Sequence, residues 1–146
     1  MWSVGERTDH YHFTLQNGSW GEDMRVKGTD IYLTRGDTAK LTLDINMASG
    51  LDIDEVYFTV KKNVNTDDVT FSKSWVSGTG TGITKQGTDN IFIVQIDHND
   101  TKNEAFGRYR YDVQIVYSES GGDPQILTVV KPSVFVIEEE VTTGSG

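Results

Sequence analysis

The chain has 146 residues, and its 22 acidic and 13 basic side chains give a formal net charge of −9. This length suits one domain with a sizeable hydrophobic core. So acidic a chain repels nucleic acid and anionic membranes, and we expect neither as a partner. The chain has no cysteine, which excludes disulfides, thiol nucleophiles and thiolate metal sites. No apolar run approaches the roughly 20 residues that span a bilayer, and the first residues do not resemble a secretory signal.

Residues 1–28 predict a β-hairpin added to the main domain. Asn17-Gly18, a strong hairpin signal, follows an alternating segment, and we expect Trp20, Met24 and Val26 on the return strand. An isolated hairpin is marginal in water, so this segment packs either on its own core or, as an arm, on another chain. The arm has four large apolar residues that we predict to make the contact: Tyr11, Phe13, Leu15 and Trp20.

The remaining chain is dominated by apolar and polar residues that alternate with a period of two, which is typical of half-buried antiparallel strands. The pattern is clearest at residues 40–45, 56–61 and 108–115, whereas residues 91–96 are apolar on both faces and predict a central strand. Shorter strands are expected at residues 31–34, 69–75, 125–130 and 133–138, with Pro132 at the start of the last.

Turn-forming residues separate these segments, and many short strands between such turns indicate an all-β sandwich or barrel. The best helical candidate is one turn at residues 100–105. We therefore predict an N-terminal arm at 1–28, one β-sandwich domain at 29–142 and a short polar tail at 143–146. The glycine-rich stretch at residues 77–82 is interpreted as a flexible hairpin tip.

Residues 100–112 place the fold more closely. An Asp-Thr turn is followed by Gly-x-Tyr-x-Tyr at the start of a strand, as in a tyrosine corner, where a tyrosine hydroxyl binds upstream backbone. Either tyrosine could fill this role. The sequence therefore predicts an immunoglobulin-like antiparallel β-sandwich without a disulfide. Five residues are predicted to determine this fold: Asp100, Thr101, Gly107, Tyr109 and Tyr111.

Four segments in order carry a family resemblance. They are Arg-Gly-Asp-Thr at residues 35–38 between two strands, the valine-containing strand at 54–62, the corner at 100–112 and the strand with its acidic end at 135–142. Together they resemble small virion structural proteins of tailed phages and prophages of Gram-positive bacteria, and the N-terminal domain of baseplate upper proteins. The resemblance runs from about residue 30 to residue 142, and the N-terminal hairpin departs from it.

The resemblance implies a non-enzymatic protein of the virion, at the baseplate, at a tail or fibre attachment, or on the head. Its partners are then other virion proteins and copies of itself. Strand edges and the arm are expected to make these contacts by β-augmentation or by symmetric packing. Deleting residues 1–28 is accordingly expected to abolish assembly and to leave the core folded.

A carbohydrate-binding surface module is the alternative function. Exposed indole rings stack on sugars, and Trp75 ends a strand beside the glycine-rich stretch, where it is a candidate ligand platform. Catalysis has no support in the sequence, because neither a Gly-x-Ser-x-Gly elbow nor a phosphate-binding loop is present. We predict no catalytic residue and no cofactor.

Two weak metal patterns are interpreted as ordinary structure. His10 and His12, with Asp9 and His98, fall short of an assured set of three or four zinc ligands. The oxygen-rich stretches at 52–55 and 97–101 lack calcium-loop spacing and are expected to be turns held by Asp and Asn side chains. The Arg-Gly-Asp sequence at 35–37 is likewise expected to be a turn rather than an integrin motif.

Overall fold

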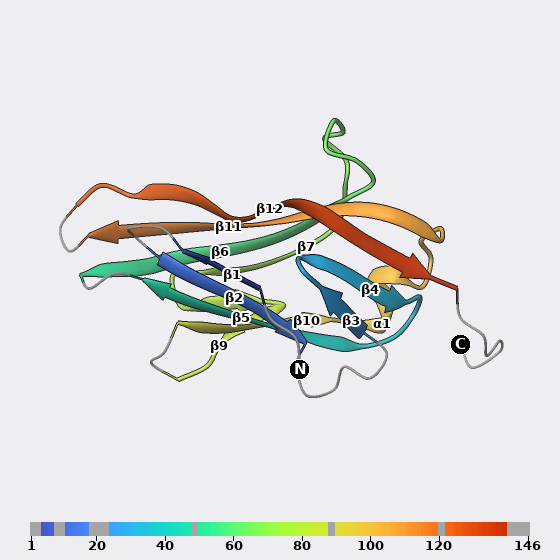
Figure 1. Cartoon of the computed structure of the whole chain (residues 1–146), viewed down its shortest axis with the longest axis horizontal. Coiled ribbons are helices and arrows are strands. Elements are labelled where there is room, and N and C mark those ends of the chain that lie inside the picture. The colour runs from blue at the N-terminus through green and yellow to red at the C-terminus, as the bar shows by residue number, and fades with distance from the viewer. Residues whose placement is uncertain are drawn as a thin grey trace.

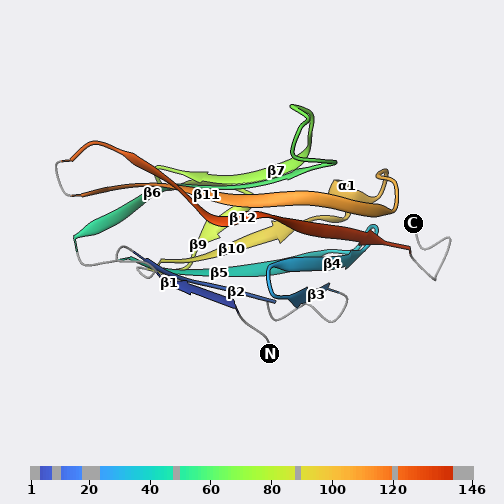
Figure 2. The ribbon, with the colours of Figure 1, turned by 45° about the horizontal axis from the view of Figure 1, so that its top comes forward.

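The fold is an immunoglobulin-like β-sandwich, which confirms the predicted fold class. A computed structural model describes residues 4–7, 11–17, 24–47, 50–87, 90–119 and 122–139. Within them, two β-sheets lie face to face, as Figures 1 and 2 show. All strand pairs but one are antiparallel, the exception being the parallel pair of β4 and β12.

The smaller sheet has five strands in the order β1-β2-β5-β10-β9. The strands of this sheet are β1 (Val4–Arg7), β2 (Tyr11–Asn17), β5 (Ala39–Met47), β10 (Ile91–Ile96) and β9 (Ile83–Lys85). The strand expected to be central, β10, does lie inside the sheet, between β5 and β9.

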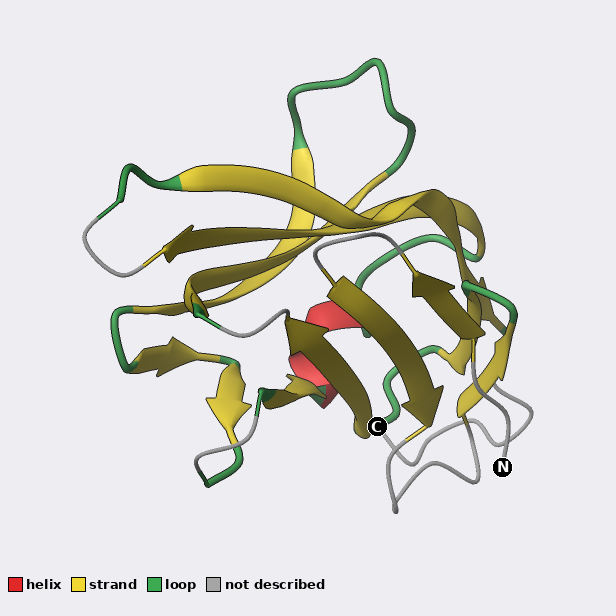
Figure 3. Cartoon of the chain, turned by 60° about the vertical axis from the view of Figure 1, so that its left-hand side comes forward, coloured by secondary structure: helices red, strands yellow, loops and turns green. Residues whose placement is uncertain are grey.

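The larger sheet has seven strands in the order β3-β4-β12-β11-β6-β7-β8. Its strands are β3 (Met24–Lys27), β4 (Asp30–Thr34), β12 (Gln125–Glu138), β11 (Gly107–Glu119), β6 (Leu51–Lys61), β7 (Val69–Val76) and β8 (Thr79–Thr81). The one helix among the described residues is α1 (His98–Thr101), which lies between β10 and β11 in the chain, two residues earlier than expected (Figure 3).

The core lies between the sheets and follows from the alternation of the strands. Every second residue of β5 points inward, and Leu41, Leu43 and Ile45 are fully buried. An aromatic cluster fills the centre of the larger sheet's inner face, with ring centroids 5.3 to 6.5 Å apart. Its four members are Phe58, Phe71, Tyr111 and Phe135. Aromatic packing of this kind adds to the free energy of hydrophobic burial.

The N-terminal segment differs from the prediction in its pairing. An N-terminal hairpin exists, but it joins β1 to β2, and β2 also pairs with β5. The predicted return strand is wrong, because β3, with buried Met24 and Val26, pairs with β4 in the opposite sheet. The Asn17-Gly18 signal is local and carries no information about this longer-range pairing. Of the predicted arm contacts, Trp20 lies outside the described residues, and Tyr11, Phe13 and Leu15 are described by their backbone on β2 only.

The two short strands expected at the C-terminal end are one long strand, β12. Its pairing with β11 shifts register between the partners of Val113 and Tyr111, which are Val130 and Ser133. Pro132 lies in this irregularity, where its missing N–H interrupts no regular ladder. The interruption that the sequence predicted between residues 130 and 133 is therefore an irregularity within one strand and not a turn between two strands. The stretch at 52–55, which we expected to be a turn, is likewise part of strand β6.

Candidate functional site

The segments that carry the sequence signals meet at one end of the sandwich, where the turn at residues 35–38 contacts α1. The backbone N–H of Gly36 donates to the Thr101 hydroxyl at 2.8 Å, and the His98 ring Nδ1 lies 2.7 Å from the Gly36 carbonyl oxygen. Gly36 has a φ of 83°, as expected for a glycine that shapes a turn. We call residues 35–36 together with residues 97–106 the turn clamp.

Arg35 extends the turn clamp to the loop after α1. Its guanidinium carbon lies 4.1 Å from the centroid of the Phe106 ring, and its Nη1 donates to the Glu104 carbonyl oxygen at 3.4 Å. The backbone N–H of Arg35 also donates to the Glu138 carbonyl oxygen at 2.9 Å. The Arg-Gly-Asp sequence is thus used in packing, in agreement with its interpretation as a turn.

A buried lysine ties the turn clamp to the larger sheet. The Lys73 side chain on β7 is only 10% exposed, and its Nζ lies 2.7 Å from Asp100 Oδ2 and 3.8 Å from Asp97 Oδ2. Asp100 Oδ2 also accepts the Asp97 backbone N–H at 2.7 Å. The oxygen-rich stretch at 97–101 is therefore a single helical turn whose start is held by the Asp100 carboxylate, and Asp100 has a second role in an ion pair.

The two corner tyrosines divide the expected role between them. The Tyr109 hydroxyl donates to the Ala105 carbonyl oxygen at 2.8 Å, which is the upstream bond of a tyrosine corner. The Tyr111 hydroxyl donates instead to the Thr29 carbonyl oxygen, beside β4. Burial raises the pKa of both phenols, so both remain protonated donors at neutral pH.

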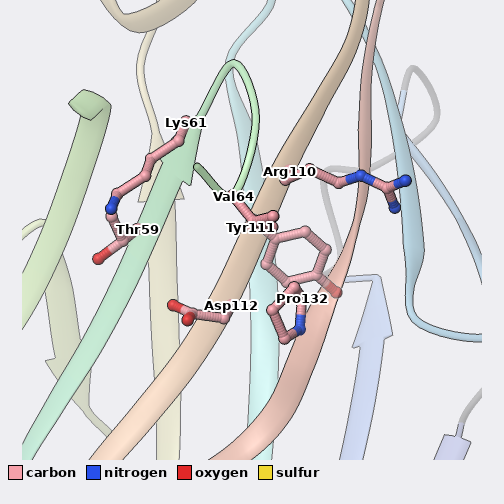
Figure 4. Close-up of a pocket in the computed structure, with 7 residues that line it drawn as sticks. All are labelled: Thr59, Lys61, Val64, Arg110, Tyr111, Asp112 and Pro132. Atoms are coloured by element: carbon pink, nitrogen blue, oxygen red, sulfur yellow. The ribbon is translucent and has the colours of Figure 1, made fainter. Parts of the chain in front are cut away.

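A small hollow opens on the outer face of the larger sheet, beside the β12 irregularity (Figure 4). It holds about 120 Å³, and ligand pockets are usually several-fold larger. Burial raises the pKa of the Asp112 carboxyl, and the positive charge of Lys61 opposes that shift. The side chains around the hollow are those of Thr59, Lys61, Val64, Arg110, Tyr111, Asp112 and Pro132.

Trp75 is not an exposed platform, so this prediction is wrong. Its residue is only 9% exposed, and its ring packs against Phe92 with the centroids 5.2 Å apart. The Lys85 ammonium lies over the Trp75 ring at 5.6 Å from the centroid. The physical reason is alternation along β7, which turns Trp75 inward together with Phe71 and Lys73.

The metal patterns of the sequence do not converge within the part of the chain that the structure describes. No group of three or more His, Asp or Glu side chains there is placed to hold a metal ion. The His98 ring is placed against the Gly36 carbonyl oxygen. Asp9 and His10 lie outside the described residues, and His12 is described by its backbone only. None of the described helices is long and apolar enough to cross a membrane.

Sequence reasoning missed Lys73, Arg35 and Phe106 as members of this cluster. Lys73 carried a usable signal, because it stands between two inward-facing aromatic residues on an alternating strand. A charge at an inward position requires a charged partner, which is here Asp100. The contact between Arg35 and Phe106 had no such signal, since the two residues are far apart in the chain.

Comparison with known proteins adds only a distant structural likeness. No protein-family model and no curated protein matches the chain. A solved structure of murine CRIg is similar in fold at 12% sequence identity, with a TM-score of 0.46. The match covers 87% of this chain and 98% of that one.

Proposed function

We propose that the chain is a non-enzymatic structural protein of a phage or prophage virion, located at the baseplate, at a tail or fibre attachment, or on the head. It works through contacts with other virion proteins and with copies of itself. The proposal starts from the four ordered segments between residues 35 and 142 that resemble such proteins.

The observation that carries the proposal is the physical connection between those segments. The turn at 35–38 is bound through Gly36 to Thr101, and the corner that follows is closed by Tyr109 on Ala105. Arg35 is bound to the last segment through the Glu138 carbonyl oxygen. The residues that carry the resemblance hold the fold together and do not form a reactive centre. They therefore support a function in which the surface of the protein binds other proteins.

A particle-association experiment tests the proposal. The prophage or phage that encodes the chain is grown, and intact particles are purified on a density gradient. We expect mass spectrometry to find the chain in the particle band at a fixed ratio to the major capsid protein, because symmetric assemblies bind their components in set numbers. A cytoplasmic host protein of similar abundance and charge is the control for carry-over.

A gene deletion completes the test. Particles made without the chain should lack a defined structure in electron micrographs, and a plasmid copy of the gene should restore it. The proposal is wrong if the chain stays in the soluble fraction and the particles without it are complete and infectious.

A further inference from the structure

Residues 125–131 of β12 form an open edge of the larger sheet. One side of this segment pairs with β11, from Gln125 to Val130. On its other side β12 pairs with β4, but only at residues 135–138, and no other described strand pairs with it. Figures 1 and 2 show β4 beside only the second half of β12. We call residues 125–131 the open edge.

The fold closes the same side of β12 immediately after this segment. Pro132 has no N–H to leave unpaired. The hydroxyl oxygens of Thr29 and Ser133 are 2.7 Å apart, and the Val134 N–H donates to Asp30 Oδ1 at 3.2 Å. From residue 135 onward β4 supplies the partner. The alternate backbone groups of the open edge are therefore the ones that remain for a further strand.

The first part of the open edge, residues 125–128, lacks the usual protection against pairing, which begins only after it with the register shift between Thr128 and Val130, then Lys131 and Pro132. Natural edge strands carry charges, proline or bulges that discourage another strand. Residues 125–128 contain neither a charge nor a proline, and their register with β11 is regular. Ile126 is 73% exposed, and the residues around it are mostly β-branched. Such a segment favours the addition of a strand.

Charges at the two ends of the open edge indicate what that strand is. Asp123 precedes the edge and Lys131 ends it, both are exposed, and no ion pair among the described residues involves either. Two copies of the edge in antiparallel orientation bring opposite charges together at both ends. A parallel arrangement instead brings like charges together, which is unfavourable. The edge is thus complementary to itself.

The side-chain directions fix the register of such a pair. Ile126 and Thr128 both face outward, because they pair with Val116 and Gln114 on β11. Facing residues of antiparallel strands point to the same side of a sheet. A two-fold axis at Leu127 places Ile126 opposite Thr128 of the second copy. The same axis brings the end of the edge that carries Lys131 close to the end of the second copy that carries Asp123.

We propose that the open edge pairs antiparallel with the open edge of a second copy of this chain, so that the two larger sheets become continuous across a two-fold axis at Leu127. The proposal rests on the proposed function and deepens it by naming the chain itself as a partner. It is an isologous contact, as most symmetric dimers use.

Sedimentation of the full chain between about 1 μM and 1 mM tests the pairing, because weak self-association falls in this range. We expect a monomer–dimer equilibrium. Lys131→Glu alone and Asp123→Lys alone should each weaken the dimer roughly tenfold, since each replaces two attractive contacts by repulsive ones. The double variant Lys131→Glu/Asp123→Lys restores opposite charges and should return the dimer constant to near the original. Lys102→Glu, an exposed reversal far from the edge, is the control and should have no effect.

A cross-linking experiment tests the register, and the absence of native cysteine makes it clean. Ile126→Cys is mixed with Thr128→Cys carrying a mass tag, and the mixture is oxidised. The proposed register predicts a tagged–untagged disulfide dimer, because facing residues of a strand pair lie within disulfide reach. Ile126→Cys mixed with tagged Ser72→Cys, which is exposed on β7, is the control.

The pairing is overturned if the chain is monomeric throughout the range, if the charge variants do not change the dimer, or if the two cysteine mixtures cross-link equally. These outcomes are distinct from failure of the proposed function. A monomer that still belongs to purified particles overturns the pairing alone. A dimer with the predicted register that is absent from the particles overturns the virion function alone.

Discussion

Two tyrosines two residues apart on β11 have different hydrogen-bond partners, one local and one distant in the chain. Tyr109 binds Ala105, only four residues upstream, and fixes the local corner. Tyr111 reaches Thr29, on a segment 82 residues away, and ties β11 to the turn between β3 and β4 of the same sheet. A buried hydroxyl left without its partner destabilises a fold, so both bonds matter for stability.

Removing the Tyr109 hydroxyl alone tests the corner. Tyr109→Phe keeps the buried ring and should lower the free energy of unfolding by about 1 kcal/mol, the usual value of one hydrogen bond. Urea unfolding followed by fluorescence measures this change. Tyr32→Phe is the control, because the contact of the Tyr32 ring with the Arg25 guanidinium is kept. An unchanged stability of Tyr109→Phe would contradict the corner.

The ionised Asp112 carboxylate destabilises the folded state, and this effect depends on pH. Burial raises the pKa of its carboxyl in the folded chain, so the folded state binds the proton more tightly than the unfolded state. Stability from this group is therefore present at low pH and is lost as pH rises from the unfolded pKa, about 3.9, through the raised folded value. Asp112→Asn should raise Tm at pH 7 by about 1 to 3 °C, and the gain should vanish near pH 3.

Calorimetry across this pH range measures the Asp112 effect. Asp52→Asn, at an exposed position on β6, controls for the loss of one negative charge from an acidic chain. A gain from Asp112→Asn that matches the control at every pH would show that burial of Asp112 has no part in it.

At the scale of elements, the contact between β7 and the segment after β8 depends on a glycine. A Cβ built on Gly82 would lie 2.3 Å from Lys73 Cδ, and Gly82 has a φ of 81°. Lys73 cannot move aside freely, because its Nζ is held by Asp100 on α1. Gly82 therefore lets the buried ion pair and the neighbouring strand occupy their places together.

Substituting this glycine tests the link between the elements. Gly82→Ala should lower the free energy of unfolding by about 2 to 4 kcal/mol, from left-handed strain and from displacement of Lys73. Gly87→Ala, where φ is 62° and no atom lies within 4 Å, should show the strain alone, about 1 to 2 kcal/mol. In a Lys73→Ala background most of the excess for Gly82→Ala should disappear, because only the contact with the residue-73 Cβ at 3.3 Å remains. An excess for Gly82→Ala that persists there undiminished would exclude Lys73 as its cause.

At the scale of the molecule, the N-terminal residues are part of both sheets. β2 covers β5 in the smaller sheet, and β3 adds Met24 and Val26 to the core of the larger one. The sequence led us to expect a core that stays folded when residues 1–28 are removed. The structure predicts the opposite outcome.

Deleting residues 1–28 should unfold the chain. Losing two buried side chains and the strands that cover β4 and β5 removes on the order of 5 kcal/mol, which is comparable with the whole stability of a small domain. Circular dichroism and amide hydrogen exchange measure the result. A chain that lacks only residues 1–3 keeps every described strand and is the control. A deletion variant with the full strand content would restore the view of residues 1–28 as a separate arm.

Local patterns were enough to place most strands, because alternation is decided by the burial of one face. They predicted strands corresponding to β5, β6, β7, β10 and β11. They also predicted the corner around Tyr109, whose partner Ala105 is four residues away. For the same reason they misjudged β12, where Pro132 was interpreted as a boundary although the pairing with β11 continues past it.

The sequence by itself determined the all-β class, the inward-facing residues and the local turns, since each depends on neighbours within a few residues. Only the tertiary structure decided that β3 lies across the sandwich from β2, that Trp75 is covered by Lys85, and that Lys73 pairs with Asp100. It also decided that the first half of β12 has an open side. These are contacts between distant segments, and their free energy depends on which surfaces the whole fold brings together.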